Sequence, residues 1–271
     1  GKDLESWKAF RKSRGEKEDK RIKNSTALYY YFYSIGTGSI GISTFNQITV
    51  ENQELLKRFR NVFVFAYRRY MDVAQAEAQA REAQIETSLE KMRAIAMGMN
   101  KPEDLLNVCE TLFKEFKSFG VDSLRNAMIN IHNDANKSFV NYDYSDEIGR
   151  STNQLVYNIH PLVEKQIKKI RSANDAFSET FFTGKDLVTW KNFRKKIGEK
   201  DDPRLDKNKG LYYYFYSIGI GAIGISTFGH ISEEKKGLLK RFRNVFALSY
   251  QRYTDIAKAE AQAREARIET S

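Results

Sequence analysis

Few side chains in this chain are suited to bind a metal ion, and they are widely spaced. The only histidines are His132, His160 and His230. None of them forms an HxH or HxxxH pair, the spacing that places two metal ligands on one face of a strand or helix. A metal site would need a third ligand, such as Asp134 or Asp143. The sequence therefore predicts no metal site, even if the three histidines line one mouth of a pocket.

The motifs of common enzymes are also missing. Cys109 is the single cysteine, which excludes an intrachain disulfide and a cysteine-based zinc site. It lies on the apolar face of an expected helix, so we interpret it as a buried structural thiol. The string GIGAIG falls in an expected hairpin and not between a strand and a helix, so it is no dinucleotide fingerprint. We predict that the chain is not an enzyme, and no motif requires a cofactor.

Aromatic side chains are concentrated in one string, LYYYFYSIG, which occurs at Leu28–Gly36 and again at Leu211–Gly219. Aromatic residues favour strands, and the glycines that follow suit the tight turn of a hairpin. Strand alternation divides the second copy into two faces, Tyr213 and Phe215 against Tyr212, Tyr214 and Tyr216. Since both faces are aromatic, we expect both to be partly covered.

A nucleic-acid interface is the main alternative for these rings. Aromatics on a sheet, with a formal net charge of +10, are typical of platforms on which single-stranded bases stack. However, no Lys or Arg lies within the aromatic string, and the basic residues are scattered among acidic ones. Exposed rings and a salt-dependent affinity for oligonucleotides would favour this alternative. Buried rings would argue against it.

The overall composition is that of a globular protein, with 41% hydrophobic and 30% charged residues. No apolar run reaches the roughly 20 residues that a membrane-spanning helix needs. No signal peptide is visible, so we expect a cytoplasmic protein without a membrane segment.

An internal repeat organises the chain. Gly1 aligns with Gly184 and Ser88 with Ser271, without a gap, and about two-thirds of these positions are identical. One full unit is therefore 89–271, and residues 1–88 correspond to the back half of a preceding unit, as in a window cut from a longer array. Two alternatives are that residues 1–88 form a small subdomain, or that their unpaired strand edges are completed by another chain in a structural assembly. Gln47 replaces His230 in the first copy, which further disfavours a metal site.

The periodicity predicts an α+β fold in which an antiparallel sheet is flanked by helices. Within the strand Leu124–His132, Met128 and Asn130 share one face, and Ala127, Ile129 and Ile131 share the other. The expected helices are 100–120, 160–175, 184–198 and 231–271, and the expected strands are 124–132, 137–144, 151–159, 212–218 and 222–228. The expected divisions are 1–51 (half repeat), 52–99 (connecting helix), 100–231 (complete core) and 232–271 (C-terminal helix).

The segment Asn52–Met97 contains nothing that breaks a helix. Its apolar residues follow spacings of three and four, which predicts a weak heptad pattern and a parallel dimeric coiled coil. The residues of this dimer helix are Tyr67, Met71, Ala74, Ala78, Ile85, Leu89 and Met92. A solvated connector, or an antiparallel contact with its own domain, is the alternative.

The phrase AEAQAREAQIETSLEKMRAIAMGMNKPEDLLNVCETLFKEFKSFGV precedes a strand-rich core, NIHPLVEKQI and the hairpin YYYFYSIG…GISTF. This combination resembles the GAF-like sensor domains that occur in tandem in bacterial signalling proteins such as sensor histidine kinases. The resemblance covers 88–271, with 1–87 as a partial copy. It implies a GAF/PAS-like fold and a non-catalytic sensory or signal-relay module. It also implies a homodimer and a kinase or DNA-binding output domain.

Domains of this family often hold a small ligand between the sheet and the helices on one face. By position, the resemblance implies a wall made by 160–193 over strands 124–132 and 212–218. The candidate pocket residues are Ile129, Ile131, Tyr157, His160, Phe177, Trp190, Tyr213 and Phe215. Relatives that carry a chromophore need a reactive cysteine near the pocket, which Cys109 does not supply. No ligand motif carries over, so the ligand is unknown, and a spacer that transmits without sensing is the alternative.

Overall fold

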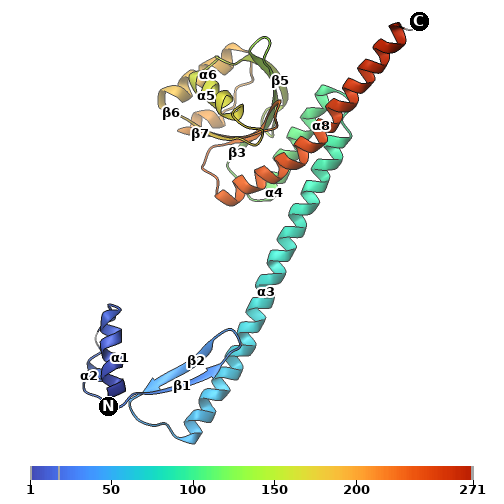
Figure 1. Ribbon diagram of the computed structural model, residues 1–271. Helices are drawn as coiled ribbons and strands as arrows, with labels where there is room; N and C mark the ends of the chain where they lie inside the picture. Colours follow the sequence, from blue (N-terminus) through green and yellow to red (C-terminus); the bar gives the residue numbers. More distant parts are fainter. Residues whose placement is uncertain (1, 18, 270–271) are drawn as a thin grey trace. The chain divides into compact units, whose positions relative to one another are not determined.

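The computed structural model describes residues 2–17 and 19–269, which form two compact units. Unit 1 comprises residues 1–82 and unit 2 comprises residues 83–271 (Figure 1). The boundary lies within one long helix, α3 (Val50–Met97), so each unit contains part of it. No helix in the described ranges is long and apolar enough to cross a membrane.

Unit 2 is built on a six-stranded antiparallel sheet with strand order β5-β4-β3-β8-β7-β6. The strands are β3 (Leu124–Asn133), β4 (Ser138–Ser145), β5 (Gly149–Val156), β6 (Phe177–Thr183), β7 (Gly210–Ser217) and β8 (Gly221–Thr227). The hairpin of the repeated aromatic string, β7–β8, pairs with β3 on one side and β6 on the other. Its strands therefore lie inside the sheet, where aromatic and β-branched residues are favoured because neighbours cover them.

Helices cover both faces of this sheet, so the fold is α+β as predicted. One face packs against the end of α3, α4 (Leu105–Ser118) and α8 (Glu233–Glu269). The other packs against α5 (Pro161–Ile170), α6 (Gly184–Lys196) and the short α7 (Arg204–Lys207). Alternation along β3 sends Ile129 into the first core and Met128 into the second. The architecture is compatible with a GAF-like fold.

The first core is a continuous apolar layer between the sheet and the long helices. Phe116 of α4 and Phe242 of α8 are fully buried, with ring centroids 5.7 Å apart. Cys109 is buried in the same layer, and its thiol donates to the Tyr142 carbonyl at 3.4 Å. Burial raises the pKa of this thiol well above its ordinary value. Cys109 is therefore the structural thiol that the sequence predicts.

Helix α4 begins at Leu105, five residues after the expected start at residue 100. A turn of 3₁₀ helix at Pro102–Asp104 precedes it, and the Asp104 carboxylate accepts from the backbone N–H of Asn100 at 2.9 Å. This bond lowers the pKa of Asp104, because it favours the ionised carboxylate. Gly120 follows the helix in the left-handed region, with φ of +79°, where a side chain would be strained.

Strand β6 was not predicted. It lies at the edge of the sheet, and buried Ser178, Thr180 and Phe182 alternate with residues that face outward. Because two of its three buried residues are polar, its hydrophobic alternation is weak. The chain also leaves β5 at Val156, three residues before the predicted end, and α5 ends at Ile170 rather than at residue 175.

The dimer helix predicted along α3 divides between two environments. Leu89 and Met92 are buried in the first core of unit 2 with α4 and α8, and Ile85 packs beside them. Packing within their own domain therefore occupies these three residues, so they are not free for a partner helix. Tyr67 and Met71 are exposed in unit 1, with Ala78 exposed and Ala74 half-buried.

Unit 1 contains α1 (Lys2–Ser13), α2 (Lys20–Lys23), β1 (Tyr29–Ser34), β2 (Ser39–Thr44) and the first part of α3. This is the order of α6, α7, β7, β8 and α8 in unit 2. Side-chain contacts recur as well. The Trp7 indole donates to the Tyr30 hydroxyl at 3.0 Å, as Trp190 does to Tyr213 at 3.0 Å. The repeated sequence thus folds the same way locally in both places.

Candidate functional site

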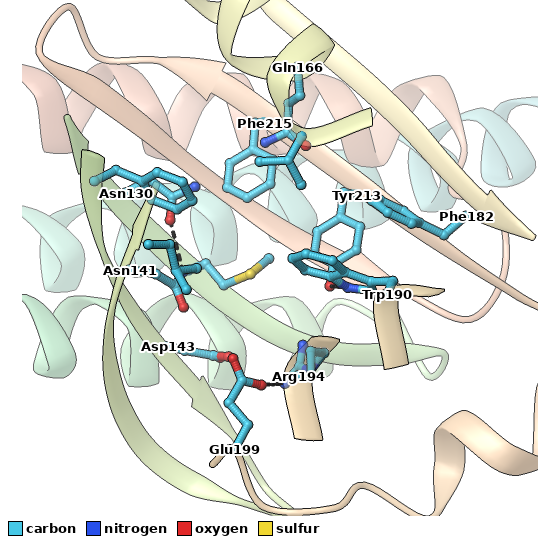
Figure 2. Close-up of a pocket in the computed structure, with 14 residues that line it drawn as sticks. Asn130, Asn141, Asp143, Gln166, Phe182, Trp190, Arg194, Glu199, Tyr213 and Phe215 are labelled. Atoms are coloured by element: carbon cyan, nitrogen blue, oxygen red, sulfur yellow. Dashed lines mark hydrogen bonds and ion pairs between the residues drawn. The ribbon is translucent and has the colours of Figure 1, made fainter. Parts of the chain in front are cut away.

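A cavity lies in the second core of unit 2, between the sheet and helices α5 and α6 (Figure 2). Its volume is about 40 Å³, room for roughly three water molecules. Strands β3, β4 and β7 form its floor, and their lining side chains all project from one face because they alternate along each strand. A larger ligand would have to displace the helices that form the opposite wall.

Aromatic rings line one side of the cavity. The Trp190 indole stands edge-on to the Tyr213 ring, with centroids 6.3 Å apart at 86°, and donates to its hydroxyl. Phe182 packs against both rings, and Phe215 stacks beside Tyr213. Strands β6 and β7 and helix α6 thus hold these rings against one another, which gives the site an aromatic, largely apolar wall.

Amide groups line another side. Asn130 and Asn141 are directly opposite each other on β3 and β4, and the Asn141 amide donates to the Asn130 side-chain oxygen at 2.8 Å. Gln166 reaches in from α5. All three side chains are buried. The site therefore offers donors and acceptors in an apolar surrounding, where hydrogen bonds contribute most to selectivity.

A buried carboxyl group closes the polar end. One oxygen of Asp143 accepts from the Asn126 amide at 2.6 Å, while the other, Oδ1, has no hydrogen-bond partner among the described residues. Burial raises the pKa of Asp143, although the positive charges of Arg125 and Arg194 oppose this effect. Burial also raises the pKa of Glu199, which pairs with Arg194.

An ion pair behind this end fixes the loop before α7 to the sheet. The Arg125 guanidinium donates to Asp202 at 3.1 Å, and both side chains are fully buried. Arg204 adds a second bond to Asp202 at 3.0 Å. Burial opposes ionisation of Asp202, but the hydrogen bond and charge of Arg204 and the charge of Arg125 outweigh it and lower its pKa.

The structure brings together only some of the predicted pocket residues. Trp190, Tyr213 and Phe215 line the cavity. His160 lies beside it, where its ring contacts Phe182 and Trp190 and its Nδ1 accepts from the Leu162 backbone at 3.2 Å. Tyr157 packs at the margin of the same core.

Three predicted pocket residues are on the wrong side of the sheet. Ile129, Ile131 and Phe177 belong to the first core, against α4 and α8. Strand alternation is the reason, because Met128 and Asn130 take the cavity face of β3. The sequence had placed Met128 and Asn130 on a common face but had not identified it as the cavity face.

The sequence analysis also missed the polar residues of the site, Asn130, Asn141, Asp143, Gln166, Arg194 and Glu199. One available signal was the period-two placement of Asn141 and Asp143 on a strand. Another was the identity of Arg11 and Glu16 with Arg194 and Glu199 across the repeat.

The histidines do not share one mouth. His132 contacts the rings of Phe139 and Tyr157, while His230 contacts Tyr212 and Tyr214 on the opposite face of the sheet. In the part of the chain that the structure describes, no three His, Cys, Asp or Glu side chains are grouped to hold a metal ion.

His132 provides a pH-dependent contribution to stability. Burial, with the charge of Arg171, lowers its pKa to about 4 despite nearby Asp134. The unfolded chain therefore binds a proton between about pH 6.5 and 4 that the folded chain does not. We expect the free energy of unfolding of unit 2 to fall by on the order of 1–2 kcal/mol as the pH falls through this window. This is less than the full difference in pKa implies, because the ring is partly exposed and solvent screens its charge.

Urea titrations at pH 7 and pH 4.5 would measure this change. His132→Gln should reduce the pH-dependent loss, while His230→Gln, beyond the hairpin, should retain it. Equal losses in the wild type and His132→Gln would contradict the assignment.

Comparisons with known proteins give distant similarity to solved structures. No family model matches the chain, and no curated protein is similar in sequence. Among solved structures, a bacteriophytochrome from the photosynthetic bacterium R. palustris aligns with a TM-score of 0.39 and 9% sequence identity. The alignment covers 89% of this chain and 46% of that one, so this chain spans less than half of that protein's length.

Proposed function

We propose that this chain is a cytoplasmic, non-catalytic sensory or signal-relay module of a bacterial signalling protein, with unit 2 as a GAF-like ligand-binding domain. A small ligand occupies the cavity between the sheet and helices α5 and α6. The observation that carries this proposal is the buried Asp143 carboxyl at the polar end of the cavity, whose Oδ1 has no hydrogen-bond partner among the described residues.

An unpartnered buried acceptor supports a binding site at this cavity over a packing defect. Leaving such a group unsatisfied costs about 1–3 kcal/mol. A ligand donor would recover this energy, and the amides of Asn130, Asn141 and Gln166 would orient the rest of its polar groups. The rings of Trp190 and Tyr213 favour an apolar portion of the ligand.

The site is mechanically connected to the long helices. Asn130 lines the cavity, while its neighbour Ile129 packs into the first core with α3, α4 and α8. Because the cavity holds so little, a ligand must shift its walls, and a shift of β3 changes the surface on which those helices pack. The signal therefore passes through the sheet to α3 and α8.

The relay proposal includes a homodimer and an output domain. Tyr67, Met71, Ala74 and Ala78 follow a three-and-four spacing on the part of α3 in unit 1, which suits a parallel pair of helices. Such a pair would carry a shift to a kinase or DNA-binding domain.

Native mass spectrometry of the purified chain, compared with the denatured chain, tests both parts. We expect a dimer with an additional mass that is lost on denaturation. Asp143→Asn should lower ligand occupancy by roughly tenfold or more, because a hydrogen bond to a charged group contributes about 1.5–3 kcal/mol. Asp146→Asn, at an exposed carboxyl three residues further on, should retain the mass.

A dimer without additional mass would contradict ligand binding. The remaining interpretation would be a domain that transmits a signal without binding a ligand. A bound mass that Asp143→Asn does not affect would place the ligand elsewhere. A monomer would contradict the parallel helix pair.

A further inference from the structure

The repeated hairpin and helix are covered in unit 2 and open in unit 1. Exposed large hydrophobic residues of unit 1 form two open faces. Tyr30 and Phe32 match Tyr213 and Phe215 of the second core, and Ile42, Phe59 and Phe63 match Ile225, Phe242 and Phe246 of the first core, on the opposite face of the sheet. Their counterparts 183 positions later are buried. The exposed fraction of the side chain differs in three matched pairs. It is 61% for Phe32 but 2% for Phe215, and 40% for Ile42 but 0% for Ile225. It is 63% for Phe59 but 0% for Phe242.

One continuous segment, Leu89–Thr183, provides the cover in unit 2. Strand β3 pairs along the outer edge of β8, with Ala127 opposite Ile225. Helix α4 places Phe116 on Phe242. Helix α5 closes the cavity over Phe215, and β6 pairs with β7. Within the described residues, the sheet of unit 1 contains only β1 and β2, so both of its edges lack these neighbours.

We propose that the two open faces of unit 1 and the outer edge of β2 dock one polypeptide segment built like Leu89–Thr183. The segment adds a strand to the outer edge of β2, lays an amphipathic helix on Phe59 and Phe63, and covers Phe32 with a second helix. Exposed apolar patches rimmed by polar residues mark interaction surfaces, and an unpaired edge strand is a template for another strand. The internal repeat indicates which kind of segment fits this surface, since the matching residues of unit 2 already pack against Leu89–Thr183.

A second copy of this chain is a poorer occupant. Each copy has one such segment, and its strands β3 and β6 are already paired with β8 and β7 of unit 2. A second copy would have to uncover its own unit 2 to cover unit 1, so no burial is gained.

The retained residues imply that docking completes a second cavity. The hairpin, α6 and the loop after α6 in unit 2 contribute Trp190, Arg194, Glu199, Tyr213 and Phe215 to the cavity wall. All five have identical counterparts in unit 1, Trp7, Arg11, Glu16, Tyr30 and Phe32. Trp7 and Tyr30 already form the hydrogen bond of the unit 2 wall. If this surface of unit 1 stayed open to water, these identical side chains would have nothing to pack against.

The test attaches a second copy of residues 89–183 directly before Gly1 of the full chain. Since Gly1 matches Gly184, this junction reproduces the natural Thr183–Gly184 spacing. Hydrogen exchange is measured in the parent and extended chains. We expect amide exchange in Tyr29–Thr44 to slow by at least about 100-fold, towards the rates of Tyr212–Thr227, because paired strands in a covered sheet open only with their domain.

The matched control carries Ile129→Pro in the added copy alone, where proline cannot continue a central strand. It should leave exchange in unit 1 as it is in the parent. Unchanged exchange in the unmodified extended chain would overturn the proposal. Concentration-dependent protection of Ser39–Thr44 in the parent would overturn it in favour of self-pairing. Salt-dependent binding of a single-stranded RNA oligonucleotide that Phe32→Ala abolishes would overturn it in favour of a nucleic-acid surface.

Discussion

Replacing Phe242 with alanine is expected to lower the free energy of unfolding of unit 2 by about 3–5 kcal/mol. The Phe242 ring is fully buried between α8 and α4, in contact with Phe116. Its removal loses the transfer energy of the ring and leaves a cavity in a close-packed layer. Phe59→Ala, the same substitution at the matching place in unit 1, removes an exposed ring and should change stability by less than about 0.5 kcal/mol.

Urea unfolding followed by tryptophan fluorescence separates the two effects. The chain has two tryptophans, one in each unit. In a Trp7→Phe background Trp190 reports on unit 2, and in a Trp190→Phe background Trp7 reports on unit 1. A loss of several kcal/mol for Phe59→Ala would mean that the open face of unit 1 around Phe59 is covered in solution. A loss below about 1 kcal/mol for Phe242→Ala would contradict the first core as described.

Asp202→Ala is the second substitution with a large expected effect, a loss of about 3–5 kcal/mol in unit 2. It leaves the Arg125 guanidinium fully buried without its counter-charge, and one of its nitrogens, Nη1, already has no partner among the described residues. An uncompensated buried charge costs far more than the pair itself contributes. Asp19→Ala removes the corresponding carboxyl in unit 1, which pairs with the exposed Arg21, and should change stability far less because solvent screens this pair.

A pH series gives an independent reading of this pair. The pKa of Asp202 is lowered in the folded state, so its contribution is present above its unfolded pKa of about 4 and is lost as the pH falls further. The wild type and Asp202→Ala should therefore converge in stability below about pH 4. A constant difference across the whole range would show that the loss comes from packing and not from charge.

The helices and the central strands were predictable because their signals are local. The three-and-four spacing of Cys109, Leu112 and Phe116 is a property of one segment, and so is the alternation of Tyr213 with Tyr214. The alternation even established that both faces of β7 are covered, and the structure confirms this with two cores. The repeat was likewise readable, because it compares the chain with itself.

The candidate site was only partly predictable. Local sequence shows which side chains share a face of a strand, but it does not show which helices cover that face. Trp190, Tyr213 and Phe215 were identified, whereas Ile129, Ile131 and Phe177 were placed on the cavity side of the sheet in error. Deciding between the faces requires knowing which helices return to which side. That depends on contacts far apart in the sequence, such as those of α5 with β6 and of α8 with β7.

The sequence by itself determined the repeat, the α+β class, the hairpin and the structural role of Cys109, since each follows from residue types at short spacing. Tertiary structure alone decided that Asp143 is buried with one oxygen free, that Arg125 meets Asp202 across the sheet, and that Leu89 and Met92 belong to a domain core. The physical reason is that burial is shared between distant segments. Identical residues at Phe59 and Phe242 are exposed in one unit and buried in the other, because only one of them has Leu89–Thr183 packed against it.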